Sequence, residues 1–509
     1  MTVKTKLLTG LVIFSLALSA CKKNTQIEPE VEIKEDVATF KQAAMIDLGG
    51  VAAAEISAYD PLTKKLFVVN NETTSRVDVI DLSNFPTVTK VKSIEFAGQG
   101  WANSVAVSNG LLAVAVEAAV KQDNGSIYVF KTSTYEEVKK VTVGALPDMV
   151  TFSPDGNYIM SANEGEPNAS YTVDPVGSIS IIDVKNNYAV KTLNFAGFEG
   201  NQTTLMAGGF RIFGGPEGSK SSFAQDIEPE YITISADSKK AYVTLQENNG
   251  VAEVDIVAGV ITKVMPLGTR DISLAENAFD VTEDGKYEAK TWPLKAYYLP
   301  DAISHFTVNG TGYFALANEG DTREYDGYKE ETTVKKVKLD PVKFPNAATL
   351  QLDANMGKLV ITEASGKNKD GFYEELYAVG GRSMSIHNAA TGAVVAHIGK
   401  DLEQHVAADL NNKYDDKRSP KKGVEVESVT VAEINGKTIA FIGMERADAI
   451  AVYDISIPNA PKFIQVFETG DAPEGLLFVK AKDSPNGRSL LIVASEEDGT
   501  MRFYQPNKL

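Results

Sequence analysis

One unit of sequence recurs along this chain. An acidic or amide residue opens a short strand, a tight turn follows, an apolar strand ends in glutamate, and a third strand closes the unit. The turns mark the unit most clearly, because Asn-Gly and Asp-Gly supply the positive φ angles that a two-residue hairpin needs. Such pairs stand at Asn109-Gly110, Asp155-Gly156, Asn309-Gly310, Asn435-Gly436 and Asn486-Gly487. Since helical periodicity is nearly absent, the pattern predicts an all-β chain.

The strands and the segments between them follow a regular order. The second strands of the unit lie at 66–70, 111–117, 158–164, 241–247, 313–319, 358–363, 438–445 and 490–496. The third strands lie at 76–82, 126–131, 178–184, 251–256, 449–455 and 500–505. Longer segments interrupt the units at 165–177, 196–227, 257–299, 320–347, 364–375 and 400–423. Function is usually found on inserted loops of this kind.

The spacing of the units predicts a β-propeller. They begin near Glu55, Asn103, Asp148, Glu230, Asp301, Ala348, Glu427 and Glu474. Without insertions the spacing is in the mid- to high forties, which matches a four-stranded blade. We expect eight blades, with seven as the alternative because the sixth unit is the least regular. The last unit lacks a fourth strand, and strand 43–49 could complete it, closing the ring and removing its exposed edges. Residues 42–509 are thus predicted to form one propeller domain.

The N-terminus has the features of an export signal. Lys4 and Lys6 precede an apolar run at 7–18, and Leu18-Ser19-Ala20 leads into Cys21, the single cysteine of the sequence. This order is typical of a lipoprotein signal peptide.

We therefore expect a signal peptide at 1–20 and a lipidated Cys21 that begins a flexible tether at 21–41. Lys22 after the cysteine favours the outer membrane of the cell envelope and leaves open which face. A net charge of −18 argues against nucleic acid and anionic lipid as partners. We expect contact with the membrane through the lipid anchor only, an unknown surface ligand or protein partner, and a monomer.

Aligned units place acidic residues at two positions. Seven of them open on an acid or amide, and a glutamate closes the second strand in all eight, at Glu72, Glu117, Glu164, Glu247, Glu319, Glu363, Glu445 and Glu496. The start of one strand and the end of the next antiparallel strand meet at one end of a hairpin. The sequence therefore predicts a ring of carboxylates at one mouth of the central channel.

The candidate ligand- or metal-binding residues are drawn from this ring and its neighbours. They are Glu55, Asp148, Glu164, Glu166, Asp226, Glu228, Glu230, Glu247, Asp301, Glu319, Asp321, Glu427, Glu445, Glu474 and Glu496. Hard cations such as Ca²⁺ or Mg²⁺ take oxygen ligands of this kind. The alternative is that each carboxylate accepts hydrogen bonds from a neighbouring loop and joins adjacent blades.

A few basic and aromatic residues bear on the same mouth. Arg323, Arg382 and Arg446 are candidates for binding an anion, or they neutralise acids of the ring. Arg418, Lys421 and Lys422 form a basic run that we expect to be an ordinary solvated loop. Trp101 and Trp292 are predicted to pack in the interior.

Other catalytic signatures are missing from the sequence. It contains no G-x-S-x-G elbow, no H-E-x-x-H pair, no Walker loop and no dinucleotide fingerprint, so no nucleotide cofactor is expected. Its four histidines lack metal-ligand spacing.

Long stretches carry a resemblance to a known family. They lie at 146–184, which begins LPDMVTFSPDGNYIMSANEGEP, and at 226–256, 299–325 and 473–500. These stretches resemble the choice-of-anchor I family of exported bacterial β-propellers, which are attached to the surface by varied anchors. The chain departs from that pattern at DDKRSPKKGVEVES (415–428) and at Val176, which thins the acidic ring.

Two functions follow as alternatives. The first is a cell-envelope lipoprotein that binds a ligand or partner through its acidic, cation-binding mouth. The second, which the family's occasional phosphatase-like or phytase-like labels imply, is a calcium-dependent phosphoric ester hydrolase. In it Glu164, Glu166, Glu230, Glu247, Glu319 and Asp321 would hold the metal. The predominance of acids favours binding, and enzymatic activity is left open.

Overall fold

The computed structural model describes residues 1–2, 34–214 and 221–509. Nearly all of the predicted signal peptide, Cys21 and most of the predicted tether lie outside the described residues. In the part of the chain that is described, no helix is long and apolar enough to cross a membrane.

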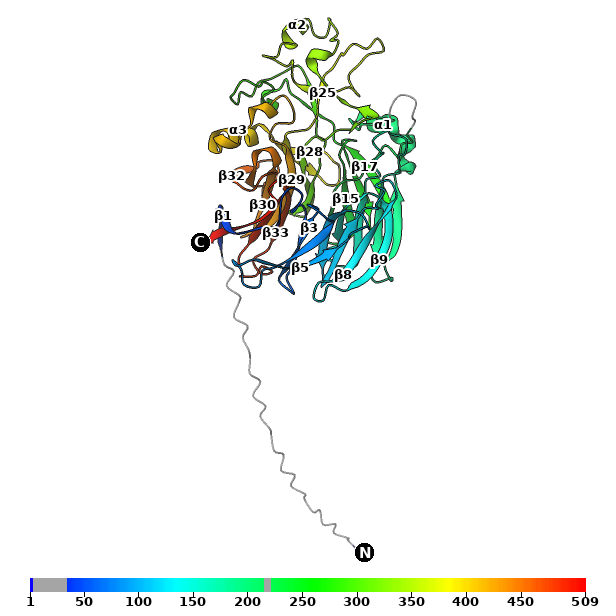
Figure 1. Cartoon of the computed structure of the whole chain (residues 1–509), viewed down its shortest axis with the longest axis vertical. Coiled ribbons are helices and arrows are strands. Elements are labelled where there is room, and N and C mark those ends of the chain that lie inside the picture. The colour runs from blue at the N-terminus through cyan, green and yellow to red at the C-terminus, as the bar shows by residue number, and fades with distance from the viewer. Residues whose placement is uncertain (3–33, 215–220) are drawn as a thin grey trace.

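Within the described ranges, seven four-stranded sheets form the blades of the propeller (Figure 1). The first two blades are β2 (Ser57–Asp60), β3 (Lys65–Asn70), β4 (Arg76–Asp81), β5 (Thr89–Glu95), and β6 (Ala102–Ser108), β7 (Leu111–Val116), β8 (Asn124–Lys131), β9 (Glu137–Ala145). The next two are β10 (Pro147–Phe152), β11 (Tyr158–Asn163), β12 (Ser178–Asp183), β13 (Ala189–Asn194), and β14 (Ile232–Ile234), β15 (Lys240–Leu245), β16 (Gly250–Asp255), β17 (Val260–Pro266). The fifth and sixth are β20 (Ile303–Val308), β21 (Thr311–Asn318), β27 (Ser383–Asn388), β28 (Val394–Ile398), and β29 (Val426–Ile434), β30 (Lys437–Met444), β31 (Ala449–Asp454), β32 (Lys462–Glu468). The seventh is β33 (Pro473–Val479), β34 (Leu490–Ser495), β35 (Thr500–Lys508) and β1 (Glu35–Asp47).

The N-terminal strand completes the last blade, as predicted. β1 pairs antiparallel with β35, from Asp47 opposite Thr500 to Glu35 opposite Lys508. The strand begins at Glu35, so residues 35–41, which we expected in the tether, belong to the blade. The pairing covers the outer edge of β35 and joins the two ends of the described propeller.

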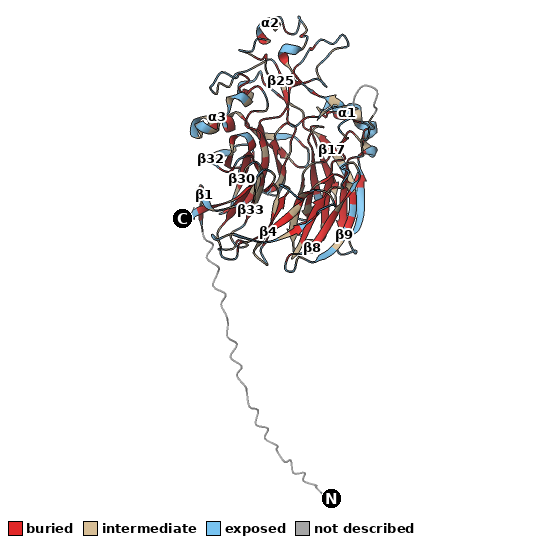
Figure 2. Cartoon of the chain, viewed as in Figure 1, coloured by how far each residue is buried: buried red, intermediate tan, exposed pale blue. Residues whose placement is uncertain are grey.

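The blades are held together by cores that lie between them. In β7, Leu112, Val114 and Val116 pack in one cluster with residues of the first blade. The alternate residues Ala113 and Ala115 pack in another cluster with residues of the third blade. Because a blade is covered on both faces, its inner strands read as continuous apolar runs. Figure 2 shows this buried interior, with exposed residues gathered on the outer strands and loops.

Among the described residues the blades number seven, which is the alternative count, rather than the eight that we expected, because the sixth unit is not a blade. Strand β25 (Val360–Thr362) lies instead in a five-stranded sheet with β24 (Glu331–Thr333), β26 (Tyr377–Ala378), β19 (Lys295–Tyr297) and β18 (Thr269–Asp271). The predicted start at Ala348 is in helix α2 (Ala347–Leu350). The fifth blade takes its third strand, β27, from beyond this insertion. The local sequence of a strand predicts that it is a strand. It does not reveal that this strand joins a five-stranded sheet instead of a four-stranded blade.

The insertion lies over one end of the propeller, at the top of Figure 1. It also contains the hairpin of β22 (Glu324–Tyr325) and β23 (Tyr328–Lys329). Helix α1 (Gln202–Ala207) comes after β13, the outer strand of the third blade, and helix α3 (Lys400–Asp409) comes after β28, the outer strand of the fifth blade (Figure 1). Trp292 packs partly buried against the core of the insertion. Trp101 is 46% exposed, so its predicted interior place is wrong.

Candidate metal centre

A β-bulge positions the acidic or amide residue that opens each blade. The pairing register of β10 with β11 skips Asp148, that of β29 with β30 skips Glu427, and that of β6 with β7 skips Asn103. The register of β33 with β34 is broken at Glu474 in the same way. A bulged residue is left unpaired and the strand bends there, which re-aims its side chain.

The remaining three blades have the same arrangement at Glu55, Glu230 and Asp301. The Glu230 N–H donates to the Thr244 carbonyl at 3.0 Å, while the Thr244 N–H donates to the Tyr231 carbonyl at 3.0 Å. One residue of the second strand thus faces two of the first. The seven bulged residues are called the inner positions: Glu55, Asn103, Asp148, Glu230, Asp301, Glu427 and Glu474.

A strained backbone residue precedes several inner positions by two residues. Leu146, Leu299, Glu425 and Ala472 all have φ between 47° and 53°. For a residue with a side chain, this left-handed region costs about 1–2 kcal/mol. The carbonyl of Leu146 accepts the N–H of Glu164 at 2.9 Å, and the carbonyl of Ala472 accepts the N–H of Glu496 at 2.9 Å. These hydrogen bonds join the left-handed residue to the end of the second strand, and they therefore hold the nearby inner position beside that end.

The ends of the second strands are less uniform than the sequence predicted. Glu117, Glu164, Glu319, Glu445 and Glu496 hold equivalent places. In the first blade Asn71 takes this place, because its N–H donates to the Ala52 carbonyl, and Gln246 takes it in the fourth blade. Glu72 instead accepts the Gly50 N–H at 2.7 Å, and Glu363 lies in the insertion beside Lys367.

All seven inner positions line one cavity of about 560 Å³, here called the central cavity. Its wall also includes Asn71, Gln246, Glu319, Asp321 and Glu445. A smaller cavity of about 280 Å³ shares Asp148, Glu230 and Asp321 with it, and adds Glu117, Glu164, Glu166 and Glu247. The described structure therefore brings most of the candidate carboxylates to one mouth, whereas Glu496 lines neither cavity.

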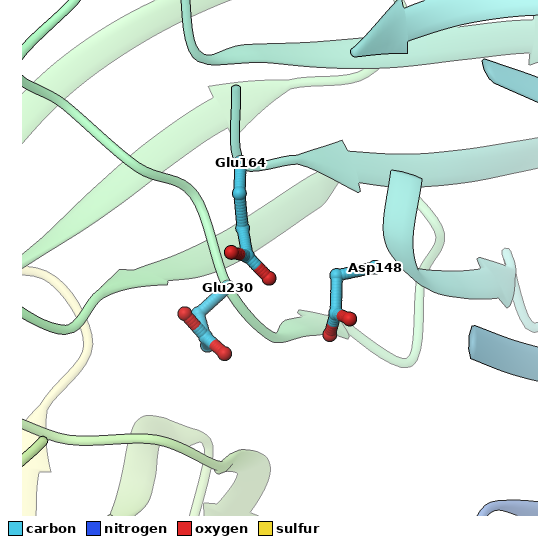
Figure 3. A group of neighbouring side chains, drawn as sticks. All are labelled: Asp148, Glu164 and Glu230. Atoms are coloured by element: carbon cyan, nitrogen blue, oxygen red, sulfur yellow. The ribbon is translucent and has the colours of Figure 1, made fainter. Parts of the chain in front are cut away.

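Three of these carboxylates form a compact group, the acidic triad. One oxygen each from Asp148, Glu164 and Glu230 lies within 4.8 Å of the others. They come from the bulge of β10, the residue after β11 and the segment before β14, and Figure 3 shows them converging. Glu164 is only 9% exposed. Among the described residues, no hydrogen bond or ion pair of the protein reaches any of the three carboxylates.

Burial and mutual repulsion raise the pKa of each triad carboxyl. Burial raises the pKa of Asp148 to about 6, although Lys121 opposes the rise. Burial, and then the charge of Glu230, raises the pKa of Glu164 well above its ordinary value. Burial also raises the pKa of Glu230 well above its ordinary value, with Glu247 adding to the rise. Three such carboxylates ionise together only when a cation compensates them.

A second acidic group is already compensated by the protein. One oxygen each from Glu319, Glu425 and Glu445 also lies within 4.8 Å of the others. Lys422 Nζ is 2.6 Å from Glu319 Oε1, and Arg446 NH2 is 2.8 Å from Glu445 Oε1. Arg446 Nε donates to Glu425 Oε2 at 3.1 Å, and Arg418 pairs with the same carboxylate. Of the two groups, the acidic triad is therefore the better place for an external cation.

Sequence reasoning missed several residues of this mouth. Arg418 and Lys422 line the central cavity, so the solvated-loop interpretation is wrong for them. Glu425 also lines it and was not a candidate. The available signal was position, because the basic run directly precedes the strand on which Glu427 was predicted to lie.

Asp226, Glu228 and Arg323 form a separate buried network. Arg323 is 1% exposed, lies 3.0 Å from Glu228 and donates to the Asp226 carbonyl at 2.7 Å. The Asp226 carboxylate accepts the N–H groups of Phe213 and Gly214. These side chains are buried against one another and against nearby backbone groups, and they line neither of the two cavities at the mouth.

Arg382 is also buried in the protein interior. Its guanidinium donates to the carbonyls of Asp280 at 2.8 Å and Ser419 at 2.7 Å, and it stacks on Phe279. Arg323 and Arg382 are both buried and line neither cavity at the mouth, which disfavours them as binders of an anion there. Arg446 is the one of the three arginine candidates that lines the central cavity.

Comparison with known proteins identifies the family of this chain. A model of the choice-of-anchor I domain matches residues 55–458. Gigasin-3a of Magallana gigas is 29% identical over an alignment of 189 residues that covers 31% of this chain and 66% of that protein. A mesenchyme-specific cell surface glycoprotein of Strongylocentrotus purpuratus is 22% identical over an alignment of 306 residues that covers 51% of this chain and 39% of that protein. The chain therefore spans less than two thirds of the length of either relative.

The fold has counterparts among solved structures. Kuenenia stuttgartiensis hydrazine synthase matches with a TM-score of 0.50 and 15% identity, over 90% of this chain and 97% of that chain. At this level of identity the likeness extends to the fold alone.

Proposed function

The chain belongs to the choice-of-anchor I family, and on that premise we propose that it is an exported propeller that binds a ligand through a divalent cation held by the acidic triad. The cation would be Ca²⁺ or Mg²⁺, since both prefer carboxylate oxygens.

One observation carries this proposal. The Glu164 carboxylate is nine-tenths buried and points at two other carboxylates, and no donor from the described residues contacts it. A buried charge without a partner is costly, whereas a divalent cation in the triad would turn this repulsion into attraction. The strained backbone at Leu146 supports the same conclusion, because strain of this kind clusters at functional sites.

Cys21 is proposed as the anchor, with the tether placing the propeller at the cell envelope, on the outer membrane. The support is the signal-like order of residues 4–21 and a relative whose name states a cell-surface location. The acidic mouth also supports our expectation that nucleic acid is not a partner, since polyphosphates need basic surfaces.

Calcium binding to the described propeller can be measured by calorimetry and by thermal melting. We expect the wild-type protein to bind Ca²⁺ with measurable heat and to melt at a higher temperature with it. A ligand at 100 times its Kd stabilises the folded state by about 2.7 kcal/mol. Glu164→Gln, which keeps the shape and removes the charge, should weaken binding by at least about tenfold, which corresponds to ~1.4 kcal/mol.

The matched control is Glu363→Gln, because Glu363 was predicted on the same ring but lies exposed in the insertion. It should bind Ca²⁺ like the wild type. Equal loss in both variants, or no calcium-dependent heat or melting shift with Ca²⁺ or Mg²⁺, would overturn the proposed site.

A further inference from the structure

The central cavity has two electrically different sides. Asp148 and Glu230 of the acidic triad line it from the third and fourth blades. The same cavity is also lined by three basic residues, here called the basic cluster: Arg418, Lys422 and Arg446. In the chain, Arg418 and Lys422 come before β29 of the sixth blade, and Arg446 comes directly after β30. A protein of net charge −18 thus has three cationic side chains in the lining of the cavity that two carboxylates of the acidic triad also line.

The basic cluster has donors left over after its ion pairs. Arg446 uses Nε on Glu425 and NH2 on Glu445. A guanidinium has five N–H donors, and among the described residues none accepts from Arg446 NH1. Lys422 has three donors, and its contacts within hydrogen-bond reach are Glu319 at 2.6 Å and Asp321 at 3.3 Å. The Arg446 side chain is 39% exposed, so a ligand can reach it.

The acidic triad would leave coordination positions open on its cation. Ca²⁺ takes about 6–8 oxygen ligands. Three carboxylates that each give one oxygen leave at least half of a sixfold shell to water or ligand. The cavity of about 560 Å³ is within the size range of small-molecule sites.

We propose that the ligand carries an oxyanion group, a phosphate or a carboxylate, which completes the shell of the triad cation and is held from the other side by Arg446 and Lys422. This inference rests on the proposed cation site and names the class of ligand that it serves. Without the cation, the surrounding carboxylates repel an anion, so binding of the two is coupled. By linkage, each raises the affinity for the other by the same factor.

Inorganic phosphate is the first probe, titrated into the full-length protein with and without Ca²⁺. We expect phosphate to bind at least about tenfold more tightly when Ca²⁺ is present, or ~1.4 kcal/mol. Malonate titrated in the same way distinguishes a carboxylate ligand from a phosphate ligand. Calcium binding without any effect of Ca²⁺ on either anion would overturn this inference and leave the proposed function standing. Absence of calcium binding overturns both.

Substitutions then separate the anion side from the metal side. Arg446→Gln and Lys422→Gln should each lower the affinity for the anion by about tenfold, which is the loss expected for one charge-assisted hydrogen bond. Neither substitution should lower the affinity for Ca²⁺, since each removes a positive charge that would repel the cation. Lys65→Gln is the control, because Lys65 pairs with Asp81 away from the cavity. Arginine and lysine variants that bind the anion like this control would contradict the inference.

A measurement on the wild-type protein avoids any dependence on folding of the variants. Mn²⁺ in place of Ca²⁺ should broaden the ³¹P resonance of bound phosphate in a protein-dependent way. Tight Mn²⁺ and phosphate binding with an unbroadened resonance would show that the two sites are separate, against the proposal.

Discussion

Carboxylates in equivalent places of this propeller have different surroundings. Glu319 and Glu164 both follow the second strand of a blade. Glu319 accepts a hydrogen bond from Gln246 at 2.9 Å and pairs with Lys422, whereas no described donor contacts Glu164. The acidic ring is therefore divided into a part that the protein compensates and a part that it leaves to an external cation.

The pH dependence of stability should report the burial of the acidic ring through Glu55. Burial, and then the charge of Glu496, raises the pKa of Glu55 from 4.5 to about 8, while Asn71 opposes the rise. The folded state thus holds the proton more tightly than the unfolded state. This contribution to stability is fully present below the unfolded pKa and is lost as the pH rises through about 8.

We expect the metal-free protein to melt at a lower temperature at about pH 8.5 than at about pH 5. The first value lies just above the folded-state pKa of Glu55 and the second just above its unfolded-state pKa. Glu55→Gln should reduce the difference, because the amide does not titrate. Calorimetry with a chelator measures it. The Glu363→Gln control should keep the wild-type pH dependence. A Glu55→Gln variant that also keeps it would show that Glu55 does not titrate in this range.

Among the secondary-structure elements, the insertion of the fifth blade depends on buried ion pairs to dock on its neighbours. Arg323 follows β21, yet its guanidinium donates to the Tyr171 hydroxyl at 3.0 Å and pairs with Glu228 at 3.0 Å. Its planar group also lies 4.7 Å from the ring of Phe213. One arginine therefore joins three segments from the third and fourth blades to the insertion.

Arg323→Met should destabilise the protein strongly, because it leaves Glu228 buried and unpaired. Breaking a buried pair in this way costs about 3–5 kcal/mol. Arg502→Met is the matched control, since Arg502 pairs with Asp498 in a partly exposed position and such pairs contribute about 0–1 kcal/mol. Denaturant unfolding would measure both, and similar losses in the two variants would refute the docking role.

The molecule as a whole is closed by its first strand. β1 makes the outer strand of the seventh blade, and Phe40 packs in a cluster with Phe441 of the sixth. The strand thus buries the edge of β35 and adds apolar contacts across a blade interface. Without it, the propeller would have an unpaired edge strand available for association with another chain.

A chain that begins at Leu48 should therefore aggregate or lose its cooperative melting. A chain that begins at Lys34 retains the whole of β1 and should melt like the full-length protein. Light scattering and calorimetry of the two truncated forms give the comparison. A monomeric, normally melting protein without β1 would show that ring closure does not depend on this strand.

The sequence specified those features that depend on local order. Period-two strands, Asn-Gly turns and repeated acids predicted four-stranded blades, an N-terminal closing strand and an acidic mouth, because each of these patterns acts within one hairpin or recurs at one spacing. All three residues of the acidic triad were among the candidates predicted from the sequence, because each stands at one of the two repeated acidic positions.

Tertiary structure determined the rest, because it depends on contacts between segments far apart in the chain. The strand at 360–362 pairs within an insertion, so the blades of the described propeller number seven. Arg323 and Arg382 are buried among loops of other blades, whereas Lys422 reaches Glu319, 103 residues away. Which carboxylates a base neutralises is set by these long-range contacts, and so the place left for a cation could not be read from local spacing.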